Sequence, residues 1–361
     1  MCIVSSNDFL TLFISIELLA FPTYFLIATS KGYHSKEASF KYLITSAVST
    51  GIFLFGVSYI YGITSSVNFS TIYEFMLDKE SSLLYAFAGI MIIFGLASKL
   101  AVFPFANWII DVYKGTETSV LAFLSTIPAL ALFGIICRLL VFPLSYSFEL
   151  AFTIAIIALI TAFWANTYAI REENIKSIMA CSSAANTSYV LLVASLVSVY
   201  NLSTVIFYLI CYVIMNIAVF GFLNITETNG IGIKTSDLKG LFHKNHGLSI
   251  AFLVALIALA GFPITSGFVA KIYLFTAIAN SGLIFVPFLL ILLILMVIAL
   301  FYYLKLMLPL FEHCDKNIEV KVLKAIYSQR FVLTAMTLLT VLIGLYPEKL
   351  IELCKFIAYN I

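Results

Sequence analysis

Long apolar stretches separated by short polar loops repeat along the whole sequence. A helix that crosses the hydrocarbon core of a bilayer needs about 20 mostly apolar residues. Stretches of that length occur ten times, so the pattern predicts ten transmembrane helices. They lie near residues 8–30, 38–62, 83–113, 117–143, 147–170, 176–199, 202–224, 248–281, 283–311 and 330–357.

The third and eighth stretches are longer than one straight crossing requires, and both are interrupted. Pro104 interrupts the third stretch, and the sequence GFPITSG, residues 261–267, interrupts the eighth. Proline has no amide hydrogen for the helical ladder, so we expect a break or kink at each place. Paired interruptions in corresponding halves of a membrane protein point to a transport site. We therefore expect two discontinuous helices, each beside a functional centre.

An internal repeat accompanies the paired breaks. The sequence YLITSAVSTGIFLFG begins at Tyr42, and the similar YLICYVIMNIAVFG begins 166 residues later at Tyr208. Lys99 and Lys271, which lie in the two broken stretches, are 172 residues apart. Because a unit of five helices is odd, its second copy must lie inverted in the membrane. Chance similarity between apolar helices is the alternative explanation.

The predicted fold is an all-α polytopic membrane protein built of two inverted five-helix repeats. Residues 1–143 form the first repeat, which is incomplete, and residues 144–311 the inverted second, while residues 312–361 add a loop and a C-terminal transmembrane helix. The composition agrees, with 62% hydrophobic and 11% charged residues and a mean hydropathy of +1.09. A soluble domain carries about 25% charged residues. The sequence therefore excludes a soluble domain.

Several other classes of protein are excluded as well. The net charge of +2 gives no reason to expect nucleic acid as a partner. The six cysteines include no CxxC pair, which argues against a metal centre or a disulfide framework. No phosphate-binding loop, nucleophile motif or ligand spacing for haem, flavin or an iron–sulfur cluster occurs. We expect no bond-making chemistry and no redox cofactor in this chain.

Positive charges are divided unevenly between the loops. The loops after the odd-numbered stretches, here called side A, hold 14 lysine and arginine residues, whereas side B holds four. Loops rich in these residues face the cytoplasm, or the matrix of an organelle. Both chain ends then lie on the opposite side. A start there without a signal sequence suggests that preceding helices are missing or are encoded elsewhere. The side A residues are Lys31, Lys36, Lys41, Lys114, Arg171, Lys176, Lys234, Lys239, Lys244, Lys305, Lys316, Lys321, Lys324 and Arg330, and the side B residues are Lys79, Arg138, Lys349 and Lys355.

Three ionisable residues lie inside the predicted membrane spans. Lys99 has apolar residues on both sides, Lys271 follows the second break, and Glu17 lies about ten residues into the first span. A lysine at the centre of a bilayer costs at least ~2.5 kcal/mol, so such a residue usually faces a polar interior and handles a proton or an ion. Glu17 is the natural partner of Lys99, and the pair could act as a proton switch. The alternatives are lysines that extend to the membrane interface and an ion pair that only fixes helix packing.

Polar residues of the sixth and seventh spans could bond between helices or hold a file of water, and simple packing is the alternative. They are Ser182, Ser183, Asn186, Thr187, Ser188 and Asn216. The histidines fall in loops and are expected to be solvated; they are His34, His243, His246 and His313.

Several motifs resemble those of one family. GLASKLAVFPFANWIIDVYKG is similar to GLxFKLxxVPFHFWxPDVYEG, NIKSIMACSSAANTSY to NIKRxLAYSSIAHxGY, and LALAGFPITSGFVAKIYLF to LSLAGIPPTAGFxGKFYLF. SSNDFLTLFISIELL, YLICYVIMN and SDLKGL resemble further segments of that family. By these motifs the chain resembles the N-type antiporter-like subunits of respiratory complex I, the proton-pumping NADH:quinone oxidoreductase.

The resemblance implies a proton-translocating subunit in the membrane arm of that enzyme complex. Glu17 and Lys99 would form the Glu–Lys pair of the first half-channel, and Lys271 would be the terminal lysine of the second. NADH, FMN, iron–sulfur clusters and quinone would be used by partner subunits, with no cofactor in this chain. Its partners would be other membrane subunits, especially neighbouring antiporter-like and small ones, and membrane lipid. The location would be a bacterial inner membrane, or alternatively the mitochondrial inner membrane.

The chain also departs from the family pattern. Ala129 follows Pro128 where the family usually has a lysine, which puts the lateral proton link in doubt. Other differences are Ala106 for histidine, Ile110 for proline, Lys114 for glutamate, Asn186 for histidine and Ser188 for glycine. A non-conducting scaffold subunit is therefore one alternative function. A subunit of a multi-subunit cation/proton antiporter, which shares the same repeat, is another. The L-, M- and D-type relatives usually have a histidine and a lysine where this chain has YVIMNIAVFGF, and their absence favours the N-type.

The charge division predicts the sidedness of the loops. In Lys36→Cys and Lys239→Cys variants of a cysteine-free chain, an impermeant thiol reagent should fail to label sealed, right-side-out vesicles, because both loops face inward. Permeabilised vesicles serve as the positive control. Ready labelling of intact vesicles would reverse the topology.

Overall fold

The computed structural model describes residues 1–30, 33–77, 83–142, 144, 148–312 and 322–359. Five residues discussed above lie outside this part of the chain, namely Lys31, Lys79, His313, Lys316 and Lys321.

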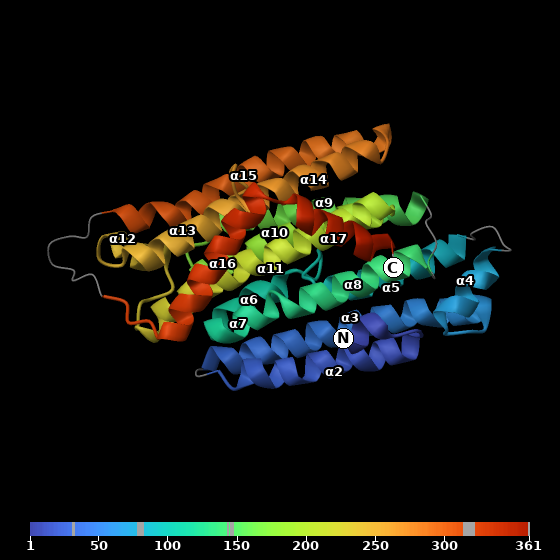
Figure 1. Ribbon diagram of the computed structural model, residues 1–361. Helices are drawn as coiled ribbons and strands as arrows, with labels where there is room; N and C mark the ends of the chain where they lie inside the picture. The colour runs from blue at the N-terminus through green and yellow to red at the C-terminus, as the bar shows by residue number, and fades with distance from the viewer. Residues whose placement is uncertain (31–32, 78–82, 143, 145–147, 313–321, 360–361) are drawn as a thin grey trace.

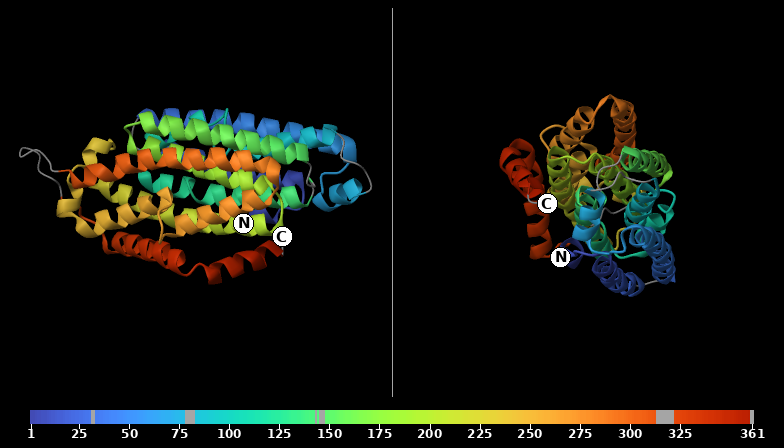
Figure 2. Two further views of the ribbon diagram at one scale, coloured as in Figure 1. Left: turned by 90° about the horizontal axis from the view of Figure 1, so that it is seen from above. Right: turned by 90° about the vertical axis from the view of Figure 1, so that its right-hand side faces the viewer.

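The described residues form a bundle of nearly parallel helices (Figures 1 and 2). The first half contains α1 (Cys2–Ser5), α2 (Phe9–Ala28), α3 (Tyr33–Thr64), α4 (Phe69–Leu77), α5 (Leu83–Ser98), α6 (Asn107–Gly115), α7 (Thr118–Leu124) and α8 (Ile127–Val141). The second half contains α9 (Phe148–Arg171), α10 (Ile175–Ser195), α11 (Val199–Thr228), η1 (Thr235–Leu238), α12 (Leu241–Lys244), α13 (His246–Ala260), α14 (Ser266–Asn280), η2 (Leu283–Phe285) and α15 (Val286–Phe311). The chain ends with α16 (Tyr327–Leu345) and α17 (Glu348–Tyr359).

Each predicted crossing corresponds to one helix or to a pair of consecutive helices. Eight segments of the described chain are long and apolar enough to span a membrane, and α5 and α13 are shorter apolar helices. The prediction of an all-α polytopic membrane protein is confirmed. The outer face of α15 shows the lipid-exposed pattern clearly, with large apolar side chains pointing away from the bundle; they are Leu290, Ile294, Val297, Phe301, Leu304 and Leu308.

Four of the predicted crossings are discontinuous, two more than the sequence indicated. The expected breaks separate α5 from α6 and α13 from α14, although α5 already ends at Ser98, before Pro104. An additional break separates α7 from α8, where Pro128 cannot donate a helical hydrogen bond to the carbonyl of Leu124. The last predicted crossing, 330–357, is divided at Pro347 into α16 and α17. The predicted C-terminal transmembrane helix corresponds to α16, which is long and apolar enough to span a membrane, and α17 follows it as a separate helix.

The two helices expected to be broken run in opposite directions through the bundle. Hydrogen bonds join Thr118, just after α6, to Glu227 at the end of α11, and join Asn245, at the start of α13, to Leu323. Both contacts lie at the side A end of the bundle. Asn201, at the start of α11, bonds to Ser281 at the end of α14, at the opposite end. The path α5–α6 therefore approaches side A while α13–α14 leaves it, as Figure 1 also shows. The exact boundaries of the two repeats stay a prediction.

Helix α10 occupies the middle of the bundle (Figure 1). All 21 of its residues are buried, which no other long helix of the described chain matches. Alanine and serine together make up nine of its 21 residues, and small side chains allow neighbouring helices to approach closely on every side. The polar character of the sixth predicted span therefore reflects its central position.

Helices α3 and α5 are in contact at two glycines. A methyl group at Gly95 would lie 2.7 Å from the backbone nitrogen of Phe53, and one at Gly56 would lie 2.8 Å from the carbonyl oxygen of Ala88. Backbone atoms cannot move aside as a flexible side chain can. The two helices can therefore approach this closely only because glycine has no side chain at these two positions.

This packing predicts different effects for two Gly→Ala substitutions in the same pair of helices. Gly95→Ala should force α3 and α5 apart and destabilise the protein by about 1–3 kcal/mol, the usual effect of overpacking. Gly62→Ala, in α3 with nothing within 4 Å, should be neutral or slightly stabilising because alanine favours helix. Thermal denaturation in mild detergent measures both. Equal midpoints for the two variants would contradict the close contact.

Candidate functional site

Glu17 and Lys99 lie together inside the first half of the bundle. Glu17 is near the middle of α2, and Lys99 follows directly after the last residue of α5. The Nζ atom of Lys99 lies 3.7 Å from Oε1 of Glu17, and the two side chains are 7% and 22% exposed. Two residues that are 82 positions apart in sequence thus form an ion pair in a largely apolar setting.

Helix α3 supplies hydrogen bonds to both members of the pair. The Thr50 hydroxyl donates to Glu17 Oε1 at 2.7 Å, and Lys99 Nζ donates to the Ser46 hydroxyl at 2.5 Å. Ser46 and Thr50 are one helical turn apart, so they present their hydroxyls on the same face. Such hydrogen bonds offset part of the large cost of removing two charges from water. Each ionic group can therefore keep a polar partner if the other moves away.

Side chains of α9 and α10 complete the backbone of the first break. Between α5 and α6, the amide of Phe103 donates to the Thr161 hydroxyl at 3.0 Å, and the Thr187 hydroxyl donates to the Leu100 carbonyl at 3.4 Å. Free backbone groups in a membrane need internal partners of this kind. The first break is thereby attached to the central helix, one residue away from Lys99.

Lys271 has a different environment from Lys99. Its buried ammonium donates to the carbonyl oxygens of Leu259 and Ala260, at 2.8 and 2.9 Å, which end α13 at the second break. No carboxylate of the described residues forms an ion pair with it. The last carbonyls of a helix are unpaired and carry the negative end of its dipole. The broken helix itself therefore stabilises this cation.

The two lysines do not occupy equivalent places in their broken helices. Lys99 ends the half-helix before the break, whereas Lys271 lies within α14, after the break. The 172-residue spacing of Lys99 and Lys271 is close to the 166-residue spacing of the repeat, but the two lysines are not strictly equivalent positions of that repeat.

An apolar groove of about 230 Å³ flanks Lys271. The loop between α13 and α14, the first turns of α14, and α15 form its walls, with side chains such as Phe262, Phe275 and Val297. Among the described residues, no acidic side chain lines the groove. Lys271 therefore has a mainly apolar space beside it.

A buried hydrogen-bond network lies around α10 between the two lysine sites. Tyr208 donates to Asn186 at 2.7 Å, Ser182 bonds to Tyr303 at 2.6 Å, and Asn186 donates to the Ser182 carbonyl at 2.8 Å. Of the polar residues predicted to bridge helices, Ser182, Ser183 and Asn186 bond to another helix, and Thr187 bonds to Leu100 in the first break. The other two, Ser188 and Asn216, bond to carbonyls of their own helices.

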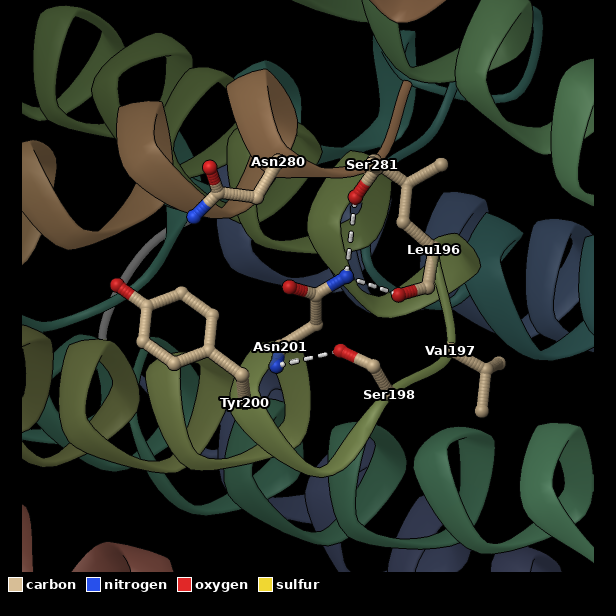
Figure 3. Close-up of a pocket in the computed structure, with 7 residues that line it drawn as sticks. All are labelled: Leu196, Val197, Ser198, Tyr200, Asn201, Asn280 and Ser281. Carbon is tan, nitrogen blue, oxygen red and sulfur yellow. Dashed lines mark hydrogen bonds between the residues drawn. The ribbon is translucent and has the colours of Figure 1, made fainter.

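A polar cavity of about 370 Å³ opens at the side B end of α14 (Figure 3). Asn201 lies at its centre and donates to the Leu196 carbonyl and to the Ser281 hydroxyl, the latter at 3.2 Å. The cavity is bounded by the turn between α10 and α11 and by the end of α14, the helix that carries Lys271. Sequence reasoning did not predict it, because the turn and the helix end are far apart along the chain.

Sequence reasoning also missed a second buried ion pair. Lys176 and Glu227 lie 2.7 Å apart at the side A end, although the sequence placed Lys176 in a loop. Both residues terminate apolar stretches, where charged residues are usually solvated. No local signal therefore distinguishes them from ordinary loop charges.

Comparison with known proteins agrees with this architecture. Residues 6–341 match the family model described as NADH:quinone oxidoreductase/Mrp antiporter, TM. The chain belongs to this family of membrane subunits.

Individual relatives are more specific. The chain is 35% identical over 288 residues to NADH-quinone oxidoreductase subunit N of Anoxybacillus flavithermus, an alignment covering 76% of this chain and 58% of the relative. It is 31% identical to subunit N 2 of Rhizobium meliloti, covering 100% of this chain and 75% of the relative. The chain thus spans only part of the length of these relatives.

Solved structures share the fold. A chain of respiratory complex I from Thermus thermophilus superimposes with a TM-score of 0.83 at 27% identity, covering 97% of this chain and 76% of that chain. A chain of the Mrp complex from a Dietzia species gives a TM-score of 0.85 at 22% identity, over 98% of this chain and 74% of that chain, and supports the fold alone.

The second break predicts the effect of a methyl group at Gly261. This residue has φ +87°, and an added Cβ would lie 2.7 Å from Cδ and 3.1 Å from Nζ of Lys271. Gly261→Ala should therefore displace the ammonium from the Ala260 carbonyl, beyond the roughly 3.5 Å limit of a hydrogen bond. Electron cryo-microscopy of the variant in nanodiscs measures that distance.

Gly282→Ala is the matched control. Gly282 also has a positive φ, +116°, but nothing lies within 4 Å of the added methyl group. With ψ 159°, Gly282 lies in a backbone region that is essentially restricted to glycine, so the substitution introduces strain of about 1–3 kcal/mol without touching Lys271. An unchanged Lys271 in Gly261→Ala, or a displaced one in Gly282→Ala, would contradict the assignment.

Proposed function

We propose that this chain is a proton-translocating membrane subunit of an NADH:quinone oxidoreductase, with Glu17, Lys99 and Lys271 as its proton-transfer residues. The observation that carries the proposal is the buried Glu17–Lys99 pair beside a helix break, 3.7 Å between its charged atoms. Buried ionisable groups within membrane helices mark ion and proton pathways. Membership of the family and the subunit N relatives add support.

Glu17 and Lys99 would act as a switch. While the carboxylate is close, it stabilises the ammonium form of Lys99 in an environment that otherwise disfavours charge. Movement of the Glu17 carboxylate away from Lys99, with its existing hydrogen bond from Thr50 retained, would remove that stabilisation and release the proton from Lys99. Return of the carboxylate would favour uptake of a new proton. The hydrogen bonds from α3 make both arrangements accessible.

Lys271 would serve as a second proton site controlled by the backbone. Its ammonium depends on the two carbonyls at the end of α13, so a small shift of that helix end would change how well the charge is stabilised. The hydroxyl and amide groups around Asn186 lie between the two sites and can exchange protons through intervening water. On the side B end of α14, the polar cavity around Asn201 would receive the proton that leaves Lys271.

A non-conducting scaffold is the second candidate function. Ala129, buried in α8 where the family usually has a lysine, carries no proton and favours this reading. The ion pair, which a scaffold does not need, argues against it. A subunit of a cation/proton antiporter, which shares the fold, is a further alternative, and the absence from α11 of the histidine and lysine usual in L-, M- and D-type relatives favours the N-type.

Several finer features belong to the same proposal. The chain would hold no cofactor of its own; the described residues contain no group of three metal-ligating side chains. NADH, FMN, iron–sulfur clusters and quinone would be handled by partner subunits. Neighbouring antiporter-like and small membrane subunits would pack beside it. The location would be a bacterial inner membrane, with the mitochondrial inner membrane as the alternative.

The switch predicts non-additive mutational effects. Lys99→Ala and Glu17→Gln should each strongly lower NADH-driven proton uptake, because each removes one half of the pair. The double variant should be little worse than either single one, since residues that act as a unit are not additive. Proton uptake is measured in membranes together with the assembled amount of the complex.

Two further variants complete the experiment. Lys271→Ala should also impair proton uptake, through the separate second site. Lys349→Ala, at an exposed lysine of side B, is the control and should leave uptake unchanged. Normal pumping by fully assembled Lys99→Ala would refute the mechanism and favour the scaffold.

A further inference from the structure

A second buried ion pair lies at the side A end of the bundle. The ammonium of Lys176, at the start of α10, lies 2.7 Å from the carboxylate of Glu227, near the end of α11. The side chain of Lys176 is 6% exposed and that of Glu227 is 34% exposed. The lysine is therefore enclosed by protein, while the acid keeps contact with the surroundings of side A.

Residues of the first half of the chain form hydrogen bonds with both members of this pair. Lys176 Nζ also donates to the carbonyl of Thr116 at 2.8 Å, and the second oxygen of Glu227 accepts from the amide of Thr118 at 2.9 Å and from its hydroxyl. Thr116 and Thr118 form the joint between α6 and α7. The pair is thus a contact between the two halves, close to the first discontinuous helix.

Polar groups continue inward from Lys176 along α10. Ser183 lies about two turns farther and bonds to Tyr212 at 2.6 Å. Thr187, one turn beyond, donates to the carbonyl of Leu100, the residue next to Lys99. Positions 176, 183 and 187 are seven and four residues apart, so they share one face of the helix. This face connects the side A pair with the Glu17–Lys99 site.

The immediate surroundings of the pair can also hold water. A cavity of about 10 Å³ lies beside it, lined by Thr118, Lys176 and Glu227 among others, which is room for about one water molecule. The buried hydroxyl of the neighbouring Ser177 has no hydrogen-bond partner among the described residues. A purely structural ion pair requires neither feature.

We propose that Glu227 and Lys176 admit protons from side A and deliver them along this face of α10 toward Lys99. The inference rests on the proposed function and extends it to the entry of protons. Lys176 releases a proton inward and becomes a neutral amine. The Glu227 carboxylate then takes a proton from side A water and passes it to the amine, which restores the ion pair. One proton enters per cycle, and the sequence requires the acid on the exposed side and the lysine on the enclosed side.

Three substitutions distinguish a role in proton transfer from that of a structural tie, an ion pair that only holds the two halves of the chain together. Lys176→Arg keeps a cation opposite Glu227, but a guanidinium does not release its proton in proteins. Glu227→Gln keeps the shape of the side chain without an ionisable group. Glu227→Asp keeps the ionisable group but shortens the side chain. Each variant is placed in the whole complex, and proton uptake per assembled complex is measured with NADH as the electron donor.

Proton transfer predicts one order of effects and a structural tie predicts the opposite order. We expect Lys176→Arg and Glu227→Gln to assemble and to lose about tenfold or more of their proton uptake, the range of a lost proton-transfer group. Glu227→Asp should retain more uptake than Glu227→Gln. The control is Glu312→Gln, in the Lys239–Glu312 pair at the same end, whose side chains are both 49% exposed. Glu312→Gln should show the same proton uptake per assembled complex as the protein without substitutions.

Two results would overturn the inference. The first is normal uptake in assembled Lys176→Arg and Glu227→Gln, with only Glu227→Asp impaired. The second is failure of all three variants to assemble, which would identify the pair as a structural tie. Lys99→Ala in the same assay distinguishes a failure of this inference from a failure of the proposed function. If Lys99→Ala stops pumping while the side A variants pump normally, only the inference fails.

Discussion

Inside a bilayer no water is available to free backbone groups or to charges, and this constraint governs the structure. Each helix break releases carbonyl and amide groups that must find partners in the protein. At the first break, hydroxyls of Thr161 and Thr187 serve the backbone between α5 and α6. At the second break, Lys271 binds the last carbonyls of α13. The backbone groups at the breaks and the buried polar side chains therefore stabilise each other, because each supplies the hydrogen-bond partner that the other lacks.

Helix α10 holds these polar groups together because it is buried on every side. Its small residues let neighbouring helices approach, while its serine, threonine and asparagine side chains bond to helices of both halves. One face leads from Lys176 past Ser183 to the first break, and another faces the tyrosines of α11 and α15. Such a helix is costly to bury unless its polar groups are paired, so its hydrogen bonds also fix the arrangement of its neighbours.

The two buried lysines differ in what stabilises their charge. Lys99 faces a carboxylate on a separate helix, and such a contact can be made and broken by a side-chain movement. Lys271 faces backbone carbonyls, which move only if the end of α13 moves. Gly261 is required at that place because any larger residue would touch the lysine. The first site is thus suited to a local switch, and the second to a change in the position of a helix.

The sequence alone determined the class of fold, its apolar crossings and the two principal breaks, and it placed Glu17, Lys99 and Lys271 inside the spans as candidate site residues, because apolar length, proline and charge within an apolar stretch are local properties. It also indicated the Glu17–Lys99 contact, since few ionic groups lie in the spans. Only the tertiary structure decided that Lys271 binds a helix end, that Lys176 and Glu227 form a buried pair, and that α7–α8 and α16–α17 are broken. The contacts of Lys271 and Lys176 join residues distant in sequence, and a charge at the end of an apolar stretch looks the same whether it is solvated or enclosed by neighbouring helices. The two additional breaks lie at Pro128 and Pro347, local signals that the sequence reasoning did not use.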